Sequence, residues 1–385
     1  MSIIDLDKEY VANTYNRFPI EIVSGKGSTL FDAEGKSYID LGSGIGVTAF
    51  GFNDEVWKNA VWEQINKVQH TSNLYYTEPC AKLAELLCLK TGMKKVFFGN
   101  SGAEANECAI KVARKYAAEN LGEDYYKILT LENSFHGRTV TTLAATGQEH
   151  YHKDFKPLTD GFIHTPANNI SALREKVAKE KIAAVMFECV QGEGGVVPIN
   201  ADFIKEIERL AKEKGFLVIV DEVQTGNGRT GKMYGYMNFN IKPDIVSTAK
   251  GLGGGLPISA TLLGDKCEKT LGFGDHGSTY GGNPVCAAGA YSVISRIDDE
   301  LLKEVREKSE YIFKYFENAK GVTEISGMGL MIGIKTQKPA AEVLKSAMEK
   351  GVLCLTAKDK IRLLPALNIP FEDLKRAVEI IKECL

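Results

Sequence analysis

One lysine of this sequence stands where it could act as a nucleophile. Lys250 comes shortly after the apolar pair Ile245-Val246 and directly before the glycine-rich segment 251–255. Most lysines lie at the solvated surface, but a lysine between a buried strand and a glycine loop is shielded from water. Desolvation disfavours the charged ammonium and lowers its pKa, which leaves a free amine that can attack a carbonyl carbon. Lys250 is therefore a candidate amine nucleophile.

A second group of residues could bind an anion. The apolar run 96–98 leads into the segment 99–103, which reads GNSGA and precedes an expected helix. At Gly102 and Ala103 the small side chains let backbone N–H groups approach a phosphate, and Ser101 can cap the helix. An ordinary helix cap would explain this motif equally well if it stood alone.

The third candidate is an acidic pair, Asp221 and Glu222, directly after the apolar run 216–220. A carboxylate at a strand end is more often a surface or capping group. Together, the three candidates match what pyridoxal phosphate requires: a phosphate site, an acid that keeps the ring nitrogen protonated, and a lysine that forms a Schiff base. Phe135, after the run 128–131, could stack on the cofactor ring.

The elements that must position these residues alternate between strand and helix. Five short apolar runs predict buried strands: 96–98, 128–131, 182–187, 216–220 and 258–263. Two amphipathic stretches predict helices: 103–119 and 201–214. This alternation predicts an α/β core with a mostly parallel sheet and right-handed crossovers. Ligands bind at the carboxyl ends of the strands in such a sheet, so the candidate residues should meet at one edge.

The pattern changes near residue 286. The features that follow are a long helical stretch, a glycine-punctuated apolar pair around 327–334, a helix near 339–350 and a last helix opened by Pro370. These features predict a smaller α+β domain. We expect residues 46–285 to form a large cofactor-binding domain, residues 286–385 to form the small domain, and residues 1–45 to pack with the small domain. A length of 385 residues suits two or three domains.

Composition excludes several classes of protein. Hydrophobic residues make up 44% and charged residues 25%, which is typical of a globular chain and not of a disordered or fibrous one. The net charge is -3 and the sequence has no basic run, so we expect neither nucleic acid nor membrane as a partner. The start of the chain is acidic and unlike a signal peptide. The eight cysteines are scattered without a CxxC pair, which favours reduced thiols, a cytoplasmic enzyme and no metal site.

Short motifs of other classes also occur. Residues 226–231 and 272–277 match the GxGxxG of NAD-dependent oxidoreductases, but neither joins a strand directly to an amphipathic helix. Residues 247–250 match the SxxK of serine acyl-enzymes and 90–92 read KTG. The glycines after SxxK cannot readily continue the helix that this chemistry needs. We expect the histidines in 150–152 to lie in a polar loop and not to bind a metal.

Longer motifs around the candidate residues resemble the class III, fold-type-I aminotransferases, and most closely their acetylornithine aminotransferase subgroup. The motifs occur in the order of the family: TYNRFP at 14–19, NSGAEAN at 100–106, FHGRT at 135–139, QGEGG at 191–195, DEVQTG at 221–226 and STYGGNP at 278–284. The resemblance runs over nearly the whole chain. Several ordered motifs are far more specific than any one of them alone.

The resemblance implies a role at the cofactor for each matching residue. Lys250 would form the Schiff base and move protons, and Asp221 would pair with the ring nitrogen. The other cofactor-binding residues would be Ser101, Gly102 and Ala103 at the phosphate, Phe135 and Val223 on the ring, and Gln224 near the ring hydroxyl. Thr279 would bind the phosphate of the neighbouring subunit's cofactor, which implies a homodimer with shared active sites.

The resemblance also implies a substrate site. Arg138 and Arg362 would bind substrate carboxylates, for which the planar guanidinium fork is suited. Glu193 would act as a gate, pairing with Arg362 for the amino donor and releasing it for glutamate, and Ser278 would lie near the substrate. The implied reaction moves the terminal amine of N-acetylornithine to 2-oxoglutarate, a step of arginine biosynthesis. Succinylornithine, ornithine and γ-aminobutyrate remain alternative donors within the same family.

Ile45 bears on the choice of donor. Ornithine aminotransferases carry a tyrosine at the position that aligns with Ile45, and its hydroxyl helps accept the free α-ammonium of ornithine. Burying that ammonium against an isoleucine would cost about 1 to 3 kcal/mol or more, whereas an acetylated nitrogen is neutral. Because γ-aminobutyrate aminotransferases are also apolar here, Ile45 argues against ornithine more than it argues for acetylornithine.

Overall fold

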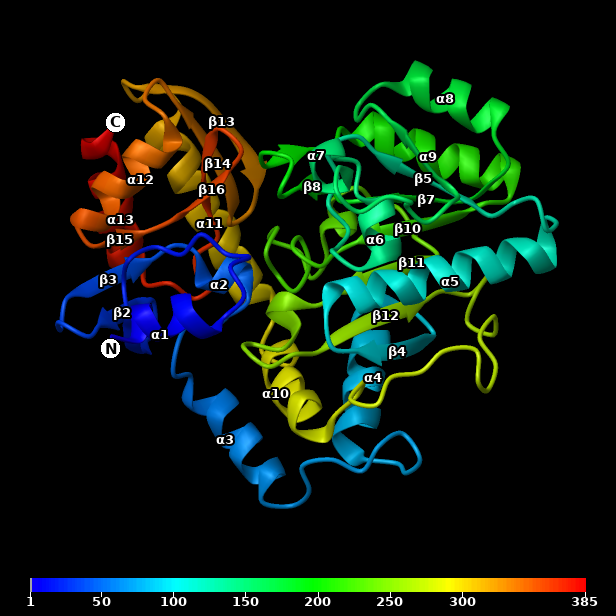
Figure 1. The fold of residues 1–385 in the computed structure, drawn as a ribbon, viewed down its shortest axis with the longest axis horizontal. Helices are drawn as coiled ribbons and strands as arrows, with labels where there is room; N and C mark the ends of the chain where they lie inside the picture. The colour runs from blue at the N-terminus through cyan, green and yellow to red at the C-terminus, as the bar shows by residue number, and fades with distance from the viewer. Residues whose placement is uncertain (1) are drawn as a thin grey trace.

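The computed structural model describes residues 2–385 and contains a seven-stranded sheet at the centre of its larger part (Figure 1). In spatial order the strands are β4 (Lys95–Gly99), β12 (Ser259–Leu263), β11 (Ile245–Thr248), β10 (Leu217–Asp221), β7 (Ile182–Phe187), β5 (Lys127–Leu131) and β6 (Phe162–Thr165). All neighbours pair in parallel except that β12 runs antiparallel to both β11 and β4. The predicted α/β core with a mostly parallel sheet is confirmed.

The strands are continuous apolar runs because both faces of the sheet are buried. Val185 and Phe187 of β7 point into one hydrophobic cluster, and Ala184 and Met186 point into the other. The same alternation holds along β10. Successive side chains along each strand therefore pack alternately into two hydrophobic cores, one on each side of the sheet.

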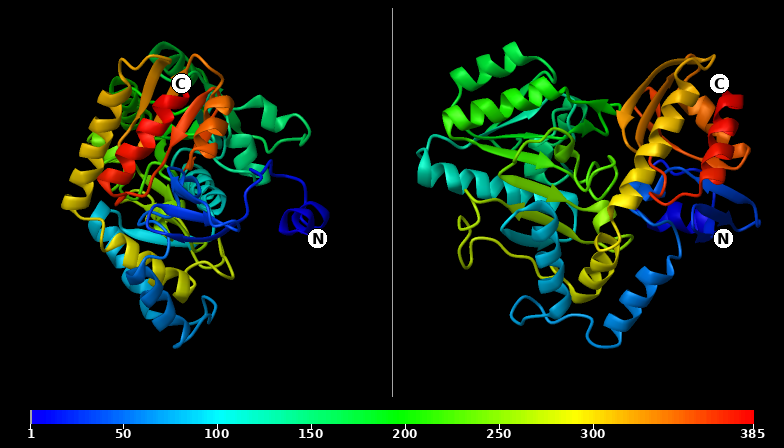
Figure 2. Two further views of the ribbon diagram at one scale, coloured as in Figure 1. Left: turned by 90° about the vertical axis from the view of Figure 1, so that its left-hand side faces the viewer. Right: turned by 180° about the vertical axis from the view of Figure 1, so that it is seen from behind.

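Helices cover both faces of this sheet (Figure 2). On one side lies α5 (Gly102–Asn120), which contacts β4, β7, β10, β11 and β12. On the other lies α9 (Ala201–Lys214), whose buried residues share a cluster with β7 and β10. Further helices are α3 (Glu55–Ile65), α4 (Glu78–Thr91), α6 (Val140–Ala145), α7 (Glu149–His152), α8 (Ile170–Lys179) and α10 (Pro284–Ile294). The expected domain boundary after residue 285 falls within α10, which packs on α3 and α4. Two short strands, β8 (Val190–Gln191) and β9 (Val197–Pro198), pair beside them.

The ends of α5 and α9 follow known capping chemistry. Ser101 caps α5 by accepting a hydrogen bond from the Glu104 N–H at 3.3 Å. The last turn of α9 closes on Gly215, which has a φ of 84° and takes the left-handed conformation that glycine tolerates best. Both predicted helices therefore begin and end close to the residues expected from the sequence.

The smaller part has an antiparallel sheet covered by helices. Its strands are β13 (Val322–Met328), β14 (Met331–Thr336), β17 (Lys360–Leu363) and β16 (Leu355–Ala357), and its helices are α11 (Asp299–Phe316), α12 (Ala340–Glu349) and α13 (Phe371–Cys384). The glycine-punctuated pair, the helix near 339–350 and the last helix after Pro370 all occur where the sequence predicts them.

Residues near the two ends of the chain share one sheet. It contains β1 (Ile22–Lys26), β2 (Thr29–Asp32) and β3 (Ser37–Asp40), and β15 (Val352–Leu353) pairs in parallel with β3. Figure 2 shows the N-terminal strands beside the C-terminal helices. On this pairing we propose to keep residues 1–45 with the small domain 286–385, apart from the large domain 46–285. Two short helices, α1 (Ile3–Tyr10) and α2 (Ser43–Gly46), flank the N-terminal strands. Within residues 2–385, no helix combines the length and apolarity needed to cross a membrane.

Candidate active site

A cavity of about 620 Å³ opens at the carboxyl ends of the parallel strands. Nine of the thirteen predicted site residues line it: Ser101, Gly102, Ala103, Phe135, Arg138, Asp221, Val223, Gln224 and Lys250. These residues come from four separate stretches of sequence. The sheet brings them together because each stretch follows a strand, namely β4, β5, β10 or β11.

Asp221 is buried at the end of β10, and three donors hold its carboxylate. Asn106 Nδ2 donates to Oδ2 at 2.8 Å, His136 Nδ1 lies 2.8 Å from the same oxygen, and the Val223 N–H donates to Oδ1 at 3.0 Å. Both Asn106 and His136 are at most 2% exposed. These hydrogen bonds hold the Asp221 carboxylate in place and away from solvent, so it could pair with a protonated ring nitrogen.

Asn106, His136 and Glu188 line the cavity, although the sequence motifs assign no role to them. Two of the three stand at positions where a polar residue is unusual. Asn106 is a polar residue on the buried face of α5, and Glu188 follows the apolar run of β7 as Asp221 follows that of β10. Glu188 accepts hydrogen bonds from the backbone N–H groups of Phe135 (2.9 Å) and Gly192 (3.2 Å). Burial raises the pKa of its carboxyl above the ordinary value.

Lys250 begins a three-residue 3₁₀ helix, Lys250–Leu252, and its side chain lines the cavity. Burial lowers the pKa of its ammonium, as expected for the candidate nucleophile. Its φ of 44° is unusual for a residue with a side chain. Three residues on, a Cβ at Gly253 would lie 2.1 Å from the Leu256 carbonyl oxygen, so the loop that turns the chain there requires glycine.

The two rival motifs lack the structure that their chemistry needs. Ser247 lies within β11 and Lys250 lies after it, so they are not one turn apart on a helix as the acyl-enzymes require. Neither 226–231 nor 272–277 opens a helix. The structure therefore supports neither a serine acyl-enzyme nor a dinucleotide-binding oxidoreductase.

The start of α5 suits a phosphate. Gly102 and Ala103 lie in the first turn of this nineteen-residue helix, where free backbone N–H groups and the helix dipole favour an anion. A Cβ added to Gly102 would lie 2.7 Å from Val223 Cγ1, so glycine permits the close approach of the two segments. Gly102 and Val223 therefore lie close together beside Asp221, at a helix start that could bind an anion.

Arg362 and Glu193 form an ion pair next to the cavity. Arg362 lies on β17 with 4% of its surface exposed, and its Nη1 is 2.5 Å from Glu193 Oε1. Gln224, which does line the cavity, accepts a hydrogen bond from the same Nη1 at 3.3 Å. Burial alone would raise the pKa of Glu193, but the charge and hydrogen bond of Arg362, together with Lys250 and Gln224, outweigh it and hold that pKa below its usual range. The buried Arg362 Nε has no partner among the described residues.

Ser278 and Thr279 do not line the cavity of their own chain. Ser278 Oγ accepts hydrogen bonds from Asn100 Nδ2 (3.1 Å) and from the Gly281 N–H (3.0 Å), and Thr279 is exposed. Ile45 lies outside the cavity as well. It is 42% exposed, in α2, with φ and ψ of 67° and 47°. α2 contacts the Lys250 helix, and Val47, two residues after Ile45, lines the cavity.

Two further segments differ from expectation. The prediction that 150–152 form a polar loop is wrong. These residues belong to α7, and His152 is buried, with its Nε2 donating to the Leu143 carbonyl at 2.9 Å. Tyr15, from the TYNRFP motif, lines the cavity although no role was assigned to it.

Comparison with known proteins identifies relatives over the full chain. The family model described as "Aminotransferase class-III" matches residues 10–385. An acetylornithine aminotransferase from Haemophilus ducreyi is 47% identical, covering 100% of this chain and 98% of the relative. One from Methanocaldococcus jannaschii is 42% identical, with 99% and 97% covered.

Solved structures with the same fold are also similar. An ornithine aminotransferase from Toxoplasma gondii, with pyridoxal phosphate at partial occupancy in its active site, superposes with a TM-score of 0.94 at 28% identity, covering 99% of this chain and 93% of that one. An N-acetylornithine aminotransferase from Stenotrophomonas maltophilia has a TM-score of 0.86 at 33% identity, with 99% and 98% covered.

Glu222, next to Asp221, fixes the loop that carries Val223 and Gln224. Its buried carboxyl accepts hydrogen bonds from Thr225 Oγ1 (2.6 Å), the Gly235 N–H (2.8 Å) and the Tyr236 N–H (2.7 Å). Burial nevertheless raises the pKa of Glu222 from 4.5 to about 7. A raised carboxyl pKa contributes stability that is fully present below pH 4.5 and is lost as the pH rises through about 7.

We therefore expect Glu222→Gln, which cannot ionise, to gain stability relative to the wild type as the pH rises through this window. Because the amide has one hydrogen-bond acceptor fewer, the free energy of unfolding of the variant should be lower than that of the wild type at low pH. The test is therefore how the free energy of unfolding changes with pH in each protein. Urea denaturation at a series of pH values measures it. Glu300→Gln, at an exposed site on α11, removes the same charge as a control. Parallel curves for Glu222→Gln and the wild type would contradict the expectation.

Proposed function

The chain belongs to the class III aminotransferases, and on that premise we propose that it transfers the terminal amine of N-acetylornithine to 2-oxoglutarate. The products are N-acetylglutamate semialdehyde and glutamate, in arginine biosynthesis. The observation that carries the reaction is the cavity shared by Lys250, Asp221 and the start of α5. The names of the relatives, 39% to 47% identical to this chain over nearly its full length, support the donor.

The enzyme acts on small amino acids and 2-oxo acids, and its cofactor is pyridoxal phosphate. When bound, this cofactor withdraws electrons from the substrate carbon that carries the amine. We assign the cofactor contacts as follows: Ser101, Gly102 and Ala103 hold the phosphate, Asp221 pairs with the ring nitrogen, Val223 and Phe135 pack on the ring, Gln224 approaches the ring hydroxyl, and Lys250 makes the covalent link. The fit is supported by the anion-binding helix start and the buried, triply supported Asp221 carboxylate.

Lys250 also moves the proton in this proposal. Burial lowers the pKa of its ammonium, so more of the Nζ is present as a free amine that can take a proton from the substrate carbon. The 3₁₀ helix holds that side chain in the cavity, which already contains the buried carboxylate. Binding and proton transfer therefore use the same nitrogen in turn.

Two arginines bind carboxylates of different substrates. Arg138 lines the cavity and takes the carboxylate of the amino donor. Arg362 is paired with Glu193, so it becomes available only when Glu193 turns away for glutamate or 2-oxoglutarate. The unpartnered Arg362 Nε is a donor that such a carboxylate would satisfy. Glu193 in this proposal is the gate.

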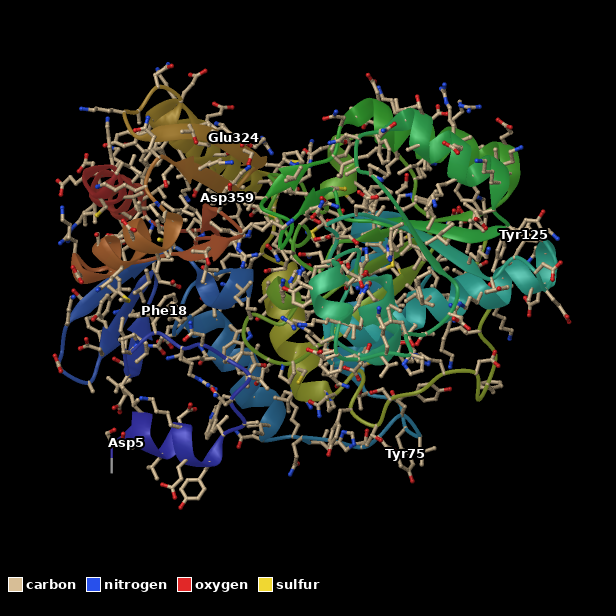
Figure 3. All side chains as sticks on the ribbon, turned by 45° about the horizontal axis from the view of Figure 1, so that its top comes forward. Asp5, Phe18, Tyr75, Tyr125, Glu324 and Asp359 are labelled. Atoms are coloured by element: carbon tan, nitrogen blue, oxygen red, sulfur yellow. The ribbon has the colours of Figure 1, made fainter. Side chains whose placement is uncertain are left out.

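Large apolar side chains support a homodimer with shared sites. Leu74, Tyr75 and Tyr76 are 85%, 71% and 107% exposed, and Figure 3 shows Tyr75 at the edge of the molecule. Exposed apolar groups of this size mark interaction surfaces. A second cavity, of about 530 Å³, is lined by Tyr75, Tyr76 and Ser278. We propose that a second copy covers this surface, and that Ser278 and Thr279 serve its active site.

The cytoplasmic location stays a prediction. All eight cysteines lie in the described part of the chain as free thiols, as is usual in a reducing compartment. Cell fractionation tests it.

Mixed dimers test the shared site. Lys250→Ala alone should show no turnover and no borohydride-reducible cofactor link, and Thr279→Val alone should retain cofactor poorly. In a heterodimer of the two variants, both lesions fall on one site and leave the other intact, so activity should return toward half that of the wild type. Verified heterodimers without activity would contradict a phosphate contact across the interface.

The donor is tested by comparing kcat/KM for N-acetylornithine, N-succinylornithine, ornithine and γ-aminobutyrate. We expect N-acetylornithine to be preferred over ornithine, because Ile45 offers no acceptor for the free α-ammonium of ornithine. A tenfold or greater preference for ornithine or γ-aminobutyrate, about 1.4 kcal/mol in transition-state binding, would overturn the donor and leave the family assignment intact.

A further inference from the structure

No carboxylate in the described part of the chain pairs with Arg138. It lines the cavity and is exposed, and within residues 2–385 its side chain forms neither an ion pair nor a hydrogen bond. Arg362, the other arginine of the proposed site, is instead held by Glu193. Since both are proposed to bind carboxylates, something other than charge pairing must keep Arg138 in place.

Aromatic rings surround the Arg138 guanidinium. Its Cζ lies 4.3 Å from the centre of the Tyr151 ring and 5.6 Å from that of Phe135. The two rings meet edge to face, with centres 5.7 Å apart and planes at 67°. His150 packs against Tyr151 with ring centres 3.9 Å apart. Tyr151 thus contacts both the arginine and the aromatic residue expected on the cofactor ring.

The short helix α7 holds Tyr151 rigidly. Gln148, just before α7, is buried and donates from Nε2 to the Ser134 carbonyl at 3.1 Å. The Gly147 N–H donates to Ser134 Oγ at 3.1 Å. At the other end of α7, buried His152 donates to the Leu143 carbonyl. Tyr151 therefore sits between two anchored residues, on a segment tied to the loop that carries Phe135.

We propose that Tyr151 is a positioning residue, whose ring holds the Arg138 guanidinium so that its N–H groups stay free for the substrate carboxylate. An aromatic face attracts a cation without occupying its donors, whereas a carboxylate partner would have to be displaced first. This accounts for the difference between the arginines: Arg362 needs a gate, and Arg138 does not. The inference rests on the proposed function, because that function gives Arg138 its carboxylate.

The test uses N-acetylnorvaline, which keeps the acetamide and carboxylate of N-acetylornithine but has no amine to react. Calorimetry on the holoenzyme compares the wild type with Tyr151→Leu, Tyr151→Phe and Phe155→Leu. Loss of the ring in Tyr151→Leu should weaken binding by roughly 5- to 30-fold, the range of a partly desolvated cation–π contact. Tyr151→Phe keeps the ring and should bind within about twofold of the wild type. Phe155 is 66% exposed on the same segment and serves as the matched control.

Steady-state kinetics separates positioning from general disruption. Tyr151→Leu should raise KM for N-acetylornithine by a similar factor and leave kcat largely unchanged, with an unchanged melting temperature. Equal binding by Tyr151→Leu and the wild type, or equally weak binding by Tyr151→Phe, would overturn the proposal. If the wild type itself neither binds N-acetylnorvaline nor uses N-acetylornithine, the proposed donor fails. The same comparison of KM for the amino donor that the wild type does use, whose carboxylate Arg138 would bind, then decides the role of Tyr151.

Discussion

The buried carboxylate of Asp221 constrains the site more than any other group. Removing a charge from water costs several kcal/mol unless donors replace the solvent, so the fold must deliver them. One comes from α5 through Asn106, one from the loop after β5 through His136, and one from the chain just beyond β10 at Val223. The hydrogen bonds to this one carboxylate therefore align three segments, and these segments also carry the proposed phosphate site, the proposed ring contacts and Arg138.

Two other buried carboxylates near Asp221 also hold loops of the cavity in place. Glu188 is held by backbone N–H groups of the loops that carry Phe135 and Glu193, and Glu222 is held by the loop that follows Gln224. Each buried acid ties a cavity-lining segment to a strand end. The side chains of Arg362 and Glu193 take no part in these hydrogen bonds to the buried acids and pair with each other. In the proposed function, the residues held by the buried acids would bind the cofactor, and Arg362 and Glu193 would change partners to select the substrate.

Much of the site could be predicted, because several of its residues directly follow a buried strand in the sequence. A strand buried on both faces is a continuous apolar run, and the residue after it lies at the ligand-binding edge of a parallel sheet. Lys250, Asp221 and the start of α5 were identified in that way. The contacts of Asn106 and His136 with Asp221 could not be predicted, because these residues lie 115 and 85 positions from Asp221 along the chain and local patterns carry no information about such pairs. Thr279 is exposed in a single chain, as expected for a residue whose proposed site belongs to a second copy.

The most direct measurement of the central claim is kcat for Asp221→Asn with cofactor occupancy determined on the same sample. An amide of the same shape keeps the packing but cannot stabilise a protonated ring nitrogen. The account predicts a folded protein that retains cofactor and loses kcat by about 100-fold or more, the scale of removing one preorganised electrostatic contact. A variant with full cofactor occupancy and near wild-type kcat would contradict it.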